Sequence, residues 1–236
     1  MPLPLVSSIL PTRNRAAFIR QALRCFDRQT YENRELVVVD DGDRSVARLC
    51  ASRPGVTYIR LDSPTPLGTK MNLGIERSRG TIIHKMDDDD YYGPHFLQAA
   101  VDRLTGKRIS SMIVAWDCFL VLLAGERQLR FSGHGWAAGG TLCFSRRVWR
   151  RGPFQDIPRS VDRRFLEDHH YRVARVCAPE MYVLVRHGGN TWNKMDRWRT
   201  DDWMRRQPVY PKGMSEILPT QDVRFYQRLL YSKTVR

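Results

Sequence analysis

Short apolar segments alternate with amphipathic segments through the first hundred residues, and this alternation limits the fold more strongly than any other feature. Strands are predicted for four apolar or β-branched runs, at residues 5–10, 35–40, 56–61 and 81–86. Helices are predicted between them, over residues 14–28, 43–51 and 67–79. Strands and helices that alternate in this way form a parallel sheet through right-handed crossovers. The sequence therefore predicts an α/β fold with a mostly parallel central sheet and helices on both faces.

The second half of the chain has a less regular pattern. A hairpin is predicted for residues 112–123 and 127–131, a strand for 139–145, a helix for 165–175 and a strand for 180–186. No internal repeat or linker divides the 236 residues, a length typical of one α/β domain. We therefore predict one domain over residues 1–190. The basic segment 191–236, rich in tryptophan and arginine, is expected to pack on this domain or extend it.

The chain carries no pattern typical of a membrane-spanning or secreted protein. Its longest wholly apolar stretch, 119–125, has seven residues, whereas a membrane span needs about 20. No basic leader precedes the first apolar run, so no signal peptide is predicted. The five cysteines are scattered without a CxxC pair, which fits neither a disulfide framework nor a zinc site. We expect a protein of the reducing cytoplasm whose thiols act as small core residues.

The net charge is unusually positive. Thirty-nine lysines and arginines stand against 25 aspartates and glutamates, which gives +14. Paired arginines concentrate in the second half, at 146–147, 150–151 and 163–164, and more follow between 197 and 206. Such charge fits an anionic partner, either nucleic acid, a phospholipid surface or a phosphate-bearing substrate. A compositional bias toward arginine explains the charge equally well, so charge alone does not identify a partner.

Polar side chains follow three of the predicted parallel strands at the point where each strand ends. Residues 11–13, Pro-Thr-Arg, follow the first strand, and Asp40 and Asp41 end the second. The fourth strand leads into four consecutive aspartates, residues 87–90. In open α/β sheets, ligands bind outside the carboxyl ends of the parallel strands. These groups are therefore predicted to share one binding edge.

The aspartate run indicates a site for a hard divalent cation. Like charges this close are unfavourable unless a cation neutralises them. Asp87 and Asp89 point the same way on an extended chain, and paired carboxylates suit Mg²⁺ or Mn²⁺ that holds a diphosphate. Neither the phosphate-loop nor the GxGxxG pattern is present, so phosphate binding would depend on the metal, Arg13, Lys70 or the helix start near Gly68. The structural alternative is a solvated acidic turn.

Taken in order, these motifs resemble those of family 2 glycosyltransferases with the GT-A fold. The motifs are Pro-Thr-Arg-Asn-Arg at 11–15, the run ending in Asp-Asp-Gly at 35–42, Leu-Gly and Asn at 67–72, Met-Asp-Asp-Asp-Asp at 86–90, and the segment 139–154 followed by Glu-Asp at 167–168. The resemblance covers roughly residues 5 to 190. It implies a GT-A-like nucleotide-binding sandwich in which residues 1–110 bind the nucleotide-sugar and residues 111–190 bind the acceptor. It also implies an inverting transfer with Mn²⁺ or Mg²⁺ as cofactor.

The resemblance implies a nucleotide-sugar site built from the strand ends and the following helix. Its members are Pro11, Thr12, Arg13, Asp40, Asp41, Lys70, Asn72, Asp87 and Asp88. The first three line the nucleotide pocket, and Asp41, with Asp40, contacts the base. Lys70 and Asn72 meet the ribose or the diphosphate. Asp87, nearer the ribose, and Asp89, nearer the metal, match the Asp-x-Asp motif.

The resemblance also implies the groups that act on the sugar and the acceptor. Asp168 matches the general base that takes the acceptor proton, and His187 matches a histidine that completes the metal shell. Sugar or acceptor contacts are implied for Gly140, Thr141, Glu167 and Trp192. Structural alternatives stay open, because an acidic pair also suits the first turn of a helix and a histidine at a strand end also suits a structural hydrogen bond.

The resemblance therefore implies a transferase that moves one sugar from a nucleotide-diphosphate sugar, with UDP-sugars favoured, and we expect its acceptor to be a hydroxyl of a cell-surface glycan or lipid-linked molecule. No Gln-x-x-Arg-Trp motif follows the predicted base, which argues against a processive polysaccharide synthase. The arginine-rich half is expected to dock on anionic lipid at the inner membrane face. Two alternatives stay open: the same transfer onto a modified nucleic-acid base, and a non-catalytic protein that binds nucleic acid or an anionic surface.

Overall fold

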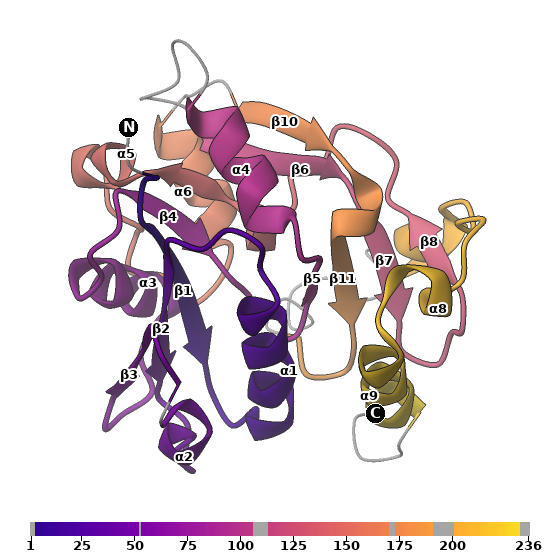
Figure 1. Ribbon diagram of the computed structural model, residues 1–236, viewed down its shortest axis with the longest axis horizontal. Coiled ribbons are helices and arrows are strands. Elements are labelled where there is room, and N and C mark those ends of the chain that lie inside the picture. Colours follow the sequence, from indigo (N-terminus) through magenta and orange to yellow (C-terminus); the bar gives the residue numbers. More distant parts are fainter. Residues whose placement is uncertain (1–2, 52, 106–112, 170–172, 191–200, 232–236) are drawn as a thin grey trace.

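The computed structural model describes residues 3–51, 53–105, 113–169, 173–190 and 201–231. Among these residues, a larger sheet has seven strands in the order β10-β6-β9-β4-β1-β2-β3 (Figure 1). The strands are β1 (Val6–Thr12), β2 (Arg34–Asp40), β3 (Val56–Arg60), β4 (Ile82–Lys85), β6 (Ile113–Cys118), β9 (Cys143–Ser145) and β10 (Val173–Cys177). All neighbouring strands run parallel except β9, which is antiparallel to β4 and β6. The predicted mostly parallel sheet is confirmed.

A smaller sheet stands beside the larger one, with the order β5-β11-β7-β8 among the described residues. Its strands are β5 (Tyr91–Tyr92), β7 (Leu120–Leu123), β8 (Leu129–Phe131) and β11 (Tyr182–Arg186). β7 and β8 pair antiparallel, which confirms the predicted hairpin. The first arm of that hairpin is shorter than predicted, because β6 belongs to the larger sheet and β7 to the smaller one. Phe119 lies between them, at the point where the chain passes from one sheet to the other.

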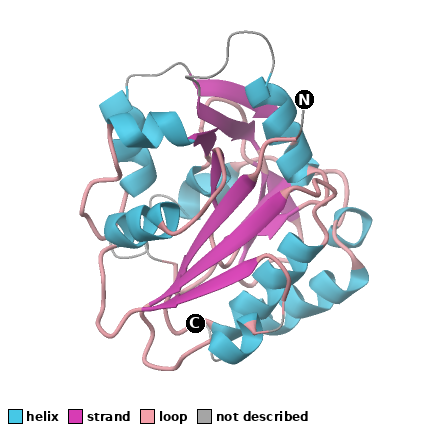
Figure 2. Cartoon of the chain, turned by 60° about the vertical axis from the view of Figure 1, so that its left-hand side comes forward, coloured by secondary structure: helices cyan, strands magenta, loops and turns pink. Residues whose placement is uncertain are grey.

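Helices cover both faces of the larger sheet (Figure 2). They are α1 (Ala16–Asp27), α2 (Ala47–Cys50), α3 (Leu67–Glu76), α4 (Phe96–Thr105), α5 (Arg146–Arg151) and α6 (Val161–His169). Successive side chains of a strand point to opposite faces, so Leu10 and Val38 pack with α1 and α4, whereas Ile9 and Val37 pack with α3, α5 and α6. This period-2 division gives the sheet an apolar layer on each face, and the predicted helices on both faces are confirmed.

Two segments differ from the prediction. The helix predicted for 165–175 begins earlier, at Val161, and ends at His169; Val173–Cys177 instead forms β10 and pairs with β6. The strand predicted for 139–145 is reduced to β9, because Gly139–Thr141 forms a short 3-10 helix. A Cβ atom at Gly139 would lie 1.8 Å from an Asp162 carboxylate oxygen, so only glycine fits this close approach.

The described part of the C-terminal segment packs against the rest of the chain. α8 (Met214–Ile217) and α9 (Thr220–Tyr231) follow a bridge between Val209 and Arg130. Asp222 of α9 is fully buried and accepts a hydrogen bond from Arg28, which directly follows α1. No helix within the described residues is long and apolar enough to cross a membrane.

The cysteines require one correction. Cys25, Cys50 and Cys143 are buried free thiols, as predicted. Cys118 and Cys177, however, are joined by a disulfide, although 59 residues separate them in the chain. The prediction failed here because the proximity arises from the pairing of β6 with β10, which no spacing pattern in the sequence encodes.

Candidate active site

Two adjoining clefts open at the carboxyl ends of the parallel strands. The strand-end cleft, about 470 Å³, is lined by the predicted residues Pro11, Thr12, Arg13, Asp41, Lys70 and Asp88. The aspartate cleft, about 290 Å³, contains all four aspartates of the 87–90 run together with Gly140. The two clefts share six lining residues, Pro11, Arg15, Leu67, Asp88, Arg159 and Asn190. The predicted binding edge is therefore a continuous depression with two compartments.

Asp41 and Lys70 form a buried ion pair in the wall of the strand-end cleft. The Lys70 ammonium donates to Asp41 over 2.8 Å, and the backbone N–H of Thr65 donates to the other carboxylate oxygen over 2.8 Å. Both side chains are more than nine-tenths buried. The pair fixes the Asp41 carboxylate at the end of β2, where a ligand in the cleft would meet it.

Each aspartate of the 87–90 run accepts at least one hydrogen bond, and Arg15 contacts two of them. Asp87 pairs with the buried Lys85 at 2.6 Å. Asp88 accepts hydrogen bonds from Thr12 at 2.7 Å and Arg15 at 2.6 Å. One oxygen of Asp89 accepts three hydrogen bonds of 3.0 Å, from Arg15, His187 Nε2 and Asn190 Nδ2. Asp90 accepts from the Val185 N–H at 2.8 Å and from the Tyr182 hydroxyl. The run is therefore not a solvated acidic turn, because partners from β1, β4, β11 and the segments that follow β1 and β11 contact its carboxyls.

Burial separates the protonation properties of these four carboxyls. It raises the pKa of Asp87 and Asp88, and with the charges of Asp89 and Asp87 it raises the pKa of Asp90 well above the ordinary value. Burial acts the same way on Asp89, but the charge of Arg15 and the hydrogen bond from His187 outweigh it and lower the pKa of Asp89 to about 2. Asp89 is therefore the carboxylate held most firmly in its ionised form.

Asp89 and His187 fit a divalent cation, provided that the ring proton of His187 moves away from Nε2. Asp89 Oδ2 and His187 Nε2 lie 3.0 Å apart, about the separation of adjacent ligands around an octahedral ion with bonds of roughly 2.1 Å. The backbone N–H of Gly189 donates to His187 Nδ1 over 3.1 Å, so in the neutral ring the proton resides on Nε2. Nε2 then donates to Asp89. Metal binding through Nε2 therefore requires the ring proton to move to Nδ1 and the contact with Gly189 to break.

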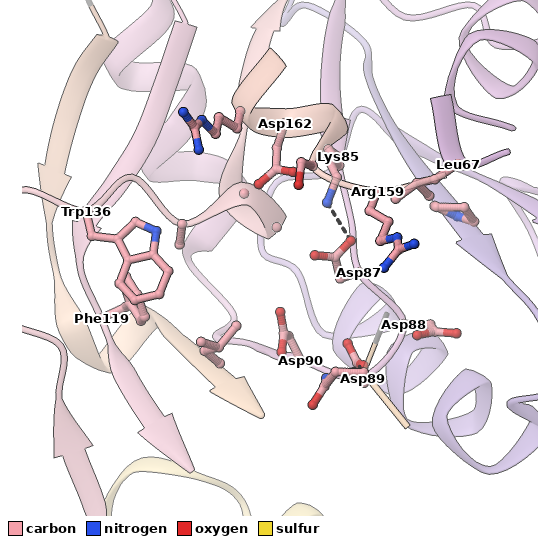
Figure 3. A pocket seen from close by; sticks show the side chains of 18 of the residues that line it. Leu67, Lys85, Asp87, Asp88, Asp89, Asp90, Phe119, Trp136, Arg159 and Asp162 are labelled. Atoms are coloured by element: carbon pink, nitrogen blue, oxygen red, sulfur yellow. Dashed lines mark hydrogen bonds and ion pairs between the residues drawn. The ribbon is translucent and has the colours of Figure 1, made fainter. Parts of the chain in front are cut away.

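Asp162 of α6 adds a fifth carboxylate to the aspartate cleft. Asp162 lines the cleft and lies against Gly139. Burial lowers the pKa of Lys85, but the charge of Asp87 and, to a smaller extent, that of Asp162 raise it above the ordinary value. Figure 3 shows Asp162, Lys85, Asp87 and Arg159 near one another, with Phe119 and Trp136 at the opposite side of the cleft.

The structure does not place Asp168, the predicted base, in either cleft. Asp168 is exposed near the end of α6 and accepts a hydrogen bond from Gln155 at 2.7 Å. Asp168 is six positions after Asp162, a spacing that turns it by about 240° around the helix and moves it about 9 Å along the axis. Glu167 is also exposed and pairs with Arg163 and Arg164. α6 begins at Val161, four residues before the predicted start, and Asp162 therefore belongs to the same helix as Asp168.

Four more predicted residues line neither cleft, namely Asp40, Asn72, Thr141 and the buried His187, and one lies outside the described part of the chain. Asp40 accepts from the backbone of Gly42 and from the side chains of Tyr58 and Arg60, so it shapes the turn after β2. Asn72 bonds the backbone of Phe154 in both directions, and Thr141 bonds the backbone of Trp116 and Ala138. These side chains support the walls instead of lining them. Trp192 lies outside the described residues.

Sequence reasoning missed several residues of the clefts. They are Arg15, Lys85, Arg159, Asp162 and Asn190. The position of Arg15, two residues after Arg13 at a strand end, was a usable signal, and so was the acidic first turn that Asp162 gives to the Val161, Phe165 and His169 pattern. Nothing in the sequence distinguishes Arg159 from the other arginines of the second half.

Comparisons with known proteins identify the family and the fold of the chain. A model of the family described as Glycosyl transferase family 2 matches residues 7–155. An uncharacterized glycosyltransferase of Bacillus subtilis, EpsJ, is 35% identical over 130 residues, which is 53% of this chain and 37% of that protein. The putative colanic acid biosynthesis glycosyl transferase WcaA of Escherichia coli is 33% identical over 99 residues, 40% of this chain and 36% of WcaA. The chain thus spans about a third of the length of these relatives.

Solved structures show the same fold at low sequence identity. The S. aureus TarS structure (residues 1–349) in complex with UDP-GlcNAc has a TM-score of 0.61 at 15% identity, and covers 79% of this chain and 60% of that one. The mannosyltransferase PcManGT from Pyrobaculum calidifontis, in complex with GDP-Man and Mn²⁺, has a TM-score of 0.62 at 18% identity, and covers 97% of this chain and 71% of that one. These similarities confirm the predicted GT-A fold. Because the family model matches well over half of the 236 residues, the chain belongs to glycosyl transferase family 2.

Proposed function

We propose that this chain transfers one sugar from a nucleotide-diphosphate sugar, with a UDP-sugar favoured, to a hydroxyl of a cell-surface glycan or lipid-linked acceptor, with inversion at the anomeric carbon. One observation carries the proposal: two adjoining clefts meet at Asp88, with polar strand ends in one and the aspartates of residues 87–90 and Asp162 in the other. TarS with UDP-GlcNAc and PcManGT with GDP-Man, which share the fold, support a nucleotide-sugar donor.

The nucleoside is proposed to bind in the strand-end cleft. Asp41, held by Lys70, would accept hydrogen bonds from the base, and residues 11–13 would contact the base and ribose. Asp88 lines both clefts and Asp87 lines the aspartate cleft, so the ribose and sugar hydroxyls would lie against this pair. The diphosphate then falls between the clefts, next to Asp89.

Mn²⁺ or Mg²⁺ is the proposed cofactor, held by Asp89 and His187. When bound, the cation would neutralise the negative charge that develops on the departing diphosphate. PcManGT, whose structure contains Mn²⁺, supports this part of the proposal.

Arg159 is proposed as a further cation for the diphosphate. It lines both clefts, and in the described part of the chain its guanidinium takes part in no hydrogen bond or ion pair. The segment before it is fixed to α3: Ile157 O accepts from the Gly68 N–H at 3.1 Å, Asp156 accepts from Thr69, and Phe154 bonds Asn72. Guanidinium groups bind phosphate oxygens through paired hydrogen bonds. Asn72 thus acts on the diphosphate indirectly, through the segment that leads to Arg159.

Replacing Arg159 by alanine is expected to weaken nucleoside diphosphate binding about tenfold to a hundredfold and to leave nucleoside binding unchanged. This range corresponds to one lost charge-assisted hydrogen bond, worth ~1.5–3 kcal/mol. Calorimetric titration with the nucleoside and its diphosphate measures both. Arg163→Ala is the matched control, because Arg163 lines the aspartate cleft but pairs with Glu167. Equal losses for nucleoside and diphosphate would contradict the assignment.

The chemical step is proposed to use Asp162 as the general base. The acceptor hydroxyl attacks the anomeric carbon while its proton passes to the Asp162 carboxylate. The bond from that carbon to the diphosphate oxygen breaks, and its electron pair leaves with the nucleoside diphosphate. Attack from the face opposite the leaving group inverts the anomeric centre. Phe119 and Trp136, which line the same cleft, offer apolar faces for the sugar rings.

An anionic membrane surface is the proposed setting for a lipid-linked acceptor. Arg147, Arg150 and Arg151 of α5 are exposed, whereas Arg163 and Arg164 are partly neutralised by Glu167. Each arginine near an anionic surface contributes about 1 kcal/mol to binding. Salt-sensitive binding to phosphatidylserine vesicles that exceeds binding to single-stranded DNA would favour a membrane over a nucleic-acid partner.

Calorimetric titration of a nucleoside diphosphate panel, with Mn²⁺ and with chelator, tests the proposed function directly. Metal-dependent binding of one nucleotide is expected, with the uridine nucleotide tightest. If no nucleotide of the panel binds under either condition, the proposal fails.

A further inference from the structure

Three side chains that sugar transfer does not use meet at the ends of β6 and β10. Cys118, Cys177 and His134 line neither cleft. Their ligand atoms, two sulfurs and one imidazole nitrogen, all lie within 4.8 Å of one another. Cys118 is buried, whereas Cys177 and His134 are exposed. In this structure the two sulfurs form a disulfide, and a histidine within reach of both has no role in such a bond.

The backbone fixes the positions of the two cysteines. β6 and β10 run parallel, and a shift of register after Val176 sets Cys177 opposite Cys118, with their Cα atoms 5.1 Å apart. Both residues are the last of their strands. The two sulfurs therefore stay neighbours whether or not a bond joins them.

The segment 132–138, which carries His134, is anchored at both ends beside Cys118. Ser132 exchanges two hydrogen bonds of 2.9 Å with the backbone of Phe119, and the Ala138 N–H donates to Trp116 O at 2.9 Å. Phe119 and Trp116 flank the Asp117–Cys118 end of β6. The anchors therefore hold His134 near the sulfurs by contacts that do not involve its own ring.

The conformation of this segment also depends on glycine. Gly133 and Gly135, on either side of His134, have φ angles of +75° and +97°. Residues that carry a side chain rarely adopt these left-handed φ angles, whereas glycine adopts them without strain. Two such glycines turn the chain sharply at His134, and the exposed ring reaches the disulfide.

We propose that Cys118, Cys177 and His134, once the disulfide is reduced, form a binding site for a soft or borderline cation such as Zn²⁺. Thiolate sulfur and imidazole nitrogen are the ligands that Zn²⁺ prefers, and three protein ligands leave a fourth position for water. Disulfide and metal exclude each other, because the same two sulfurs would have to form both. The redox state of the pair therefore decides whether the site exists.

Reduction by an external dithiol opens the site. The dithiol gives two electrons and two protons to the Cys118–Cys177 bond, which becomes two cysteine thiols, and the dithiol itself becomes a disulfide. Zn²⁺ then binds as both thiols release their protons, with His134 neutral. The other three cysteines do not compete as thiolates, since burial raises the pKa of Cys143 and raises those of Cys25 and Cys50 to about 11.

The site adjoins the aspartate cleft. Cys118 directly precedes Phe119, and His134 lies two residues before Trp136; both aromatic side chains line that cleft. A bound cation would tie the 132–138 segment to the ends of β6 and β10. Its ligands differ from the oxygen-rich set around Asp89, so the two sites select different classes of metal.

Titration of the full chain with Co²⁺, in a non-chelating phosphine reductant, tests the proposal. We expect one equivalent of Co²⁺ to produce sulfur-to-cobalt charge-transfer absorption, and Zn²⁺ to abolish it by displacement. The unreduced chain should show no such absorption. Co²⁺ bound to the aspartates gives no thiolate band, and no nucleotide is present, so the result is independent of the proposed transferase activity.

Three variants sharpen the test. Cys177→Ser and His134→Ala, both at exposed positions, should each lower the Co²⁺ affinity at least tenfold. Cys50 is buried and lies outside this cluster, so Cys50→Ser should leave the affinity unchanged. Circular dichroism of each variant checks its fold. The proposal is overturned if the reduced chain gives no charge-transfer band, or if the band persists at full affinity in Cys177→Ser or His134→Ala.

Discussion

Replacing Asp162 by asparagine is expected to lower the rate of sugar transfer about 10²- to 10⁴-fold and to leave the affinity for the nucleoside diphosphate unchanged. An amide cannot take the acceptor proton, and general-base catalysis contributes rate factors of this order. Asp162 lines the aspartate cleft on α6, whereas the strand-end cleft proposed for the nucleoside does not contain it. Turnover at saturating donor and calorimetric titration of the diphosphate measure the two quantities.

Asp168→Asn is the matched control for this prediction. Asp168 lies on the same helix, has the same charge and is exposed, with Gln155 as its hydrogen-bond partner. We expect this variant to retain the activity of the unmodified chain. The reverse pattern, with an inactive Asp168→Asn and an active Asp162→Asn, would contradict the assignment of the base to Asp162.

Replacing Asp89 by asparagine is expected to remove the metal-dependent part of nucleoside diphosphate binding, with at least a tenfold loss of affinity in Mn²⁺. Asp89 is the aspartate of the run whose pKa is lowest, at about 2, and it lies 3.0 Å from His187. An amide keeps the shape of the side chain but supplies no negative charge to the cation. Calorimetry in Mn²⁺ and in chelator separates the metal-dependent part from the rest.

His187→Gln and Asp102→Asn are compared with Asp89→Asn. His187→Gln should lower the Mn²⁺-dependent affinity less than Asp89→Asn, because the charge of Asp89 remains and a glutamine N–H still donates to it. Asp102→Asn, at an exposed position of α4, should change nothing. An Asp89→Asn variant whose diphosphate affinity is as metal-dependent as that of the unmodified chain would show that Asp89 is not a metal ligand.

The ion pairs around the aspartates hold their carboxyls in place. Arg15 contacts both Asp88 and Asp89, and Lys85 contacts Asp87. Removing one partner from a buried pair costs about 3–5 kcal/mol, because the other charge is left uncompensated. Variants of Arg15 or Lys85 therefore combine effects on folding with effects on binding, and they are less suited to test function than Asp162, Asp89 or Arg159.

Much of the fold could be predicted because its signals are local. The β-branched run that became β2 and the helical spacing that became α1 are read from neighbouring residues, and the two-residue period places Ile9 and Leu10 in opposite apolar layers. The boundaries of α6 were harder. Its apolar spacing begins at Val161, before the predicted start, and β10 forms because residues 173–177 pair with β6, not because their own sequence excludes a helix.

The sequence by itself determined the parallel sheet and the polar groups at its strand ends, since both follow from periodicity and from the geometry of parallel strands. Tertiary structure alone decided which groups face each other. Arg15 meets Asp89, Asp162 replaces Asp168 at the cleft, and Cys118 meets Cys177, although 59 residues separate that last pair. Such contacts depend on strand register, on where a helix begins and on how elements pack, and a shift of one residue in any of them would bring other side chains together.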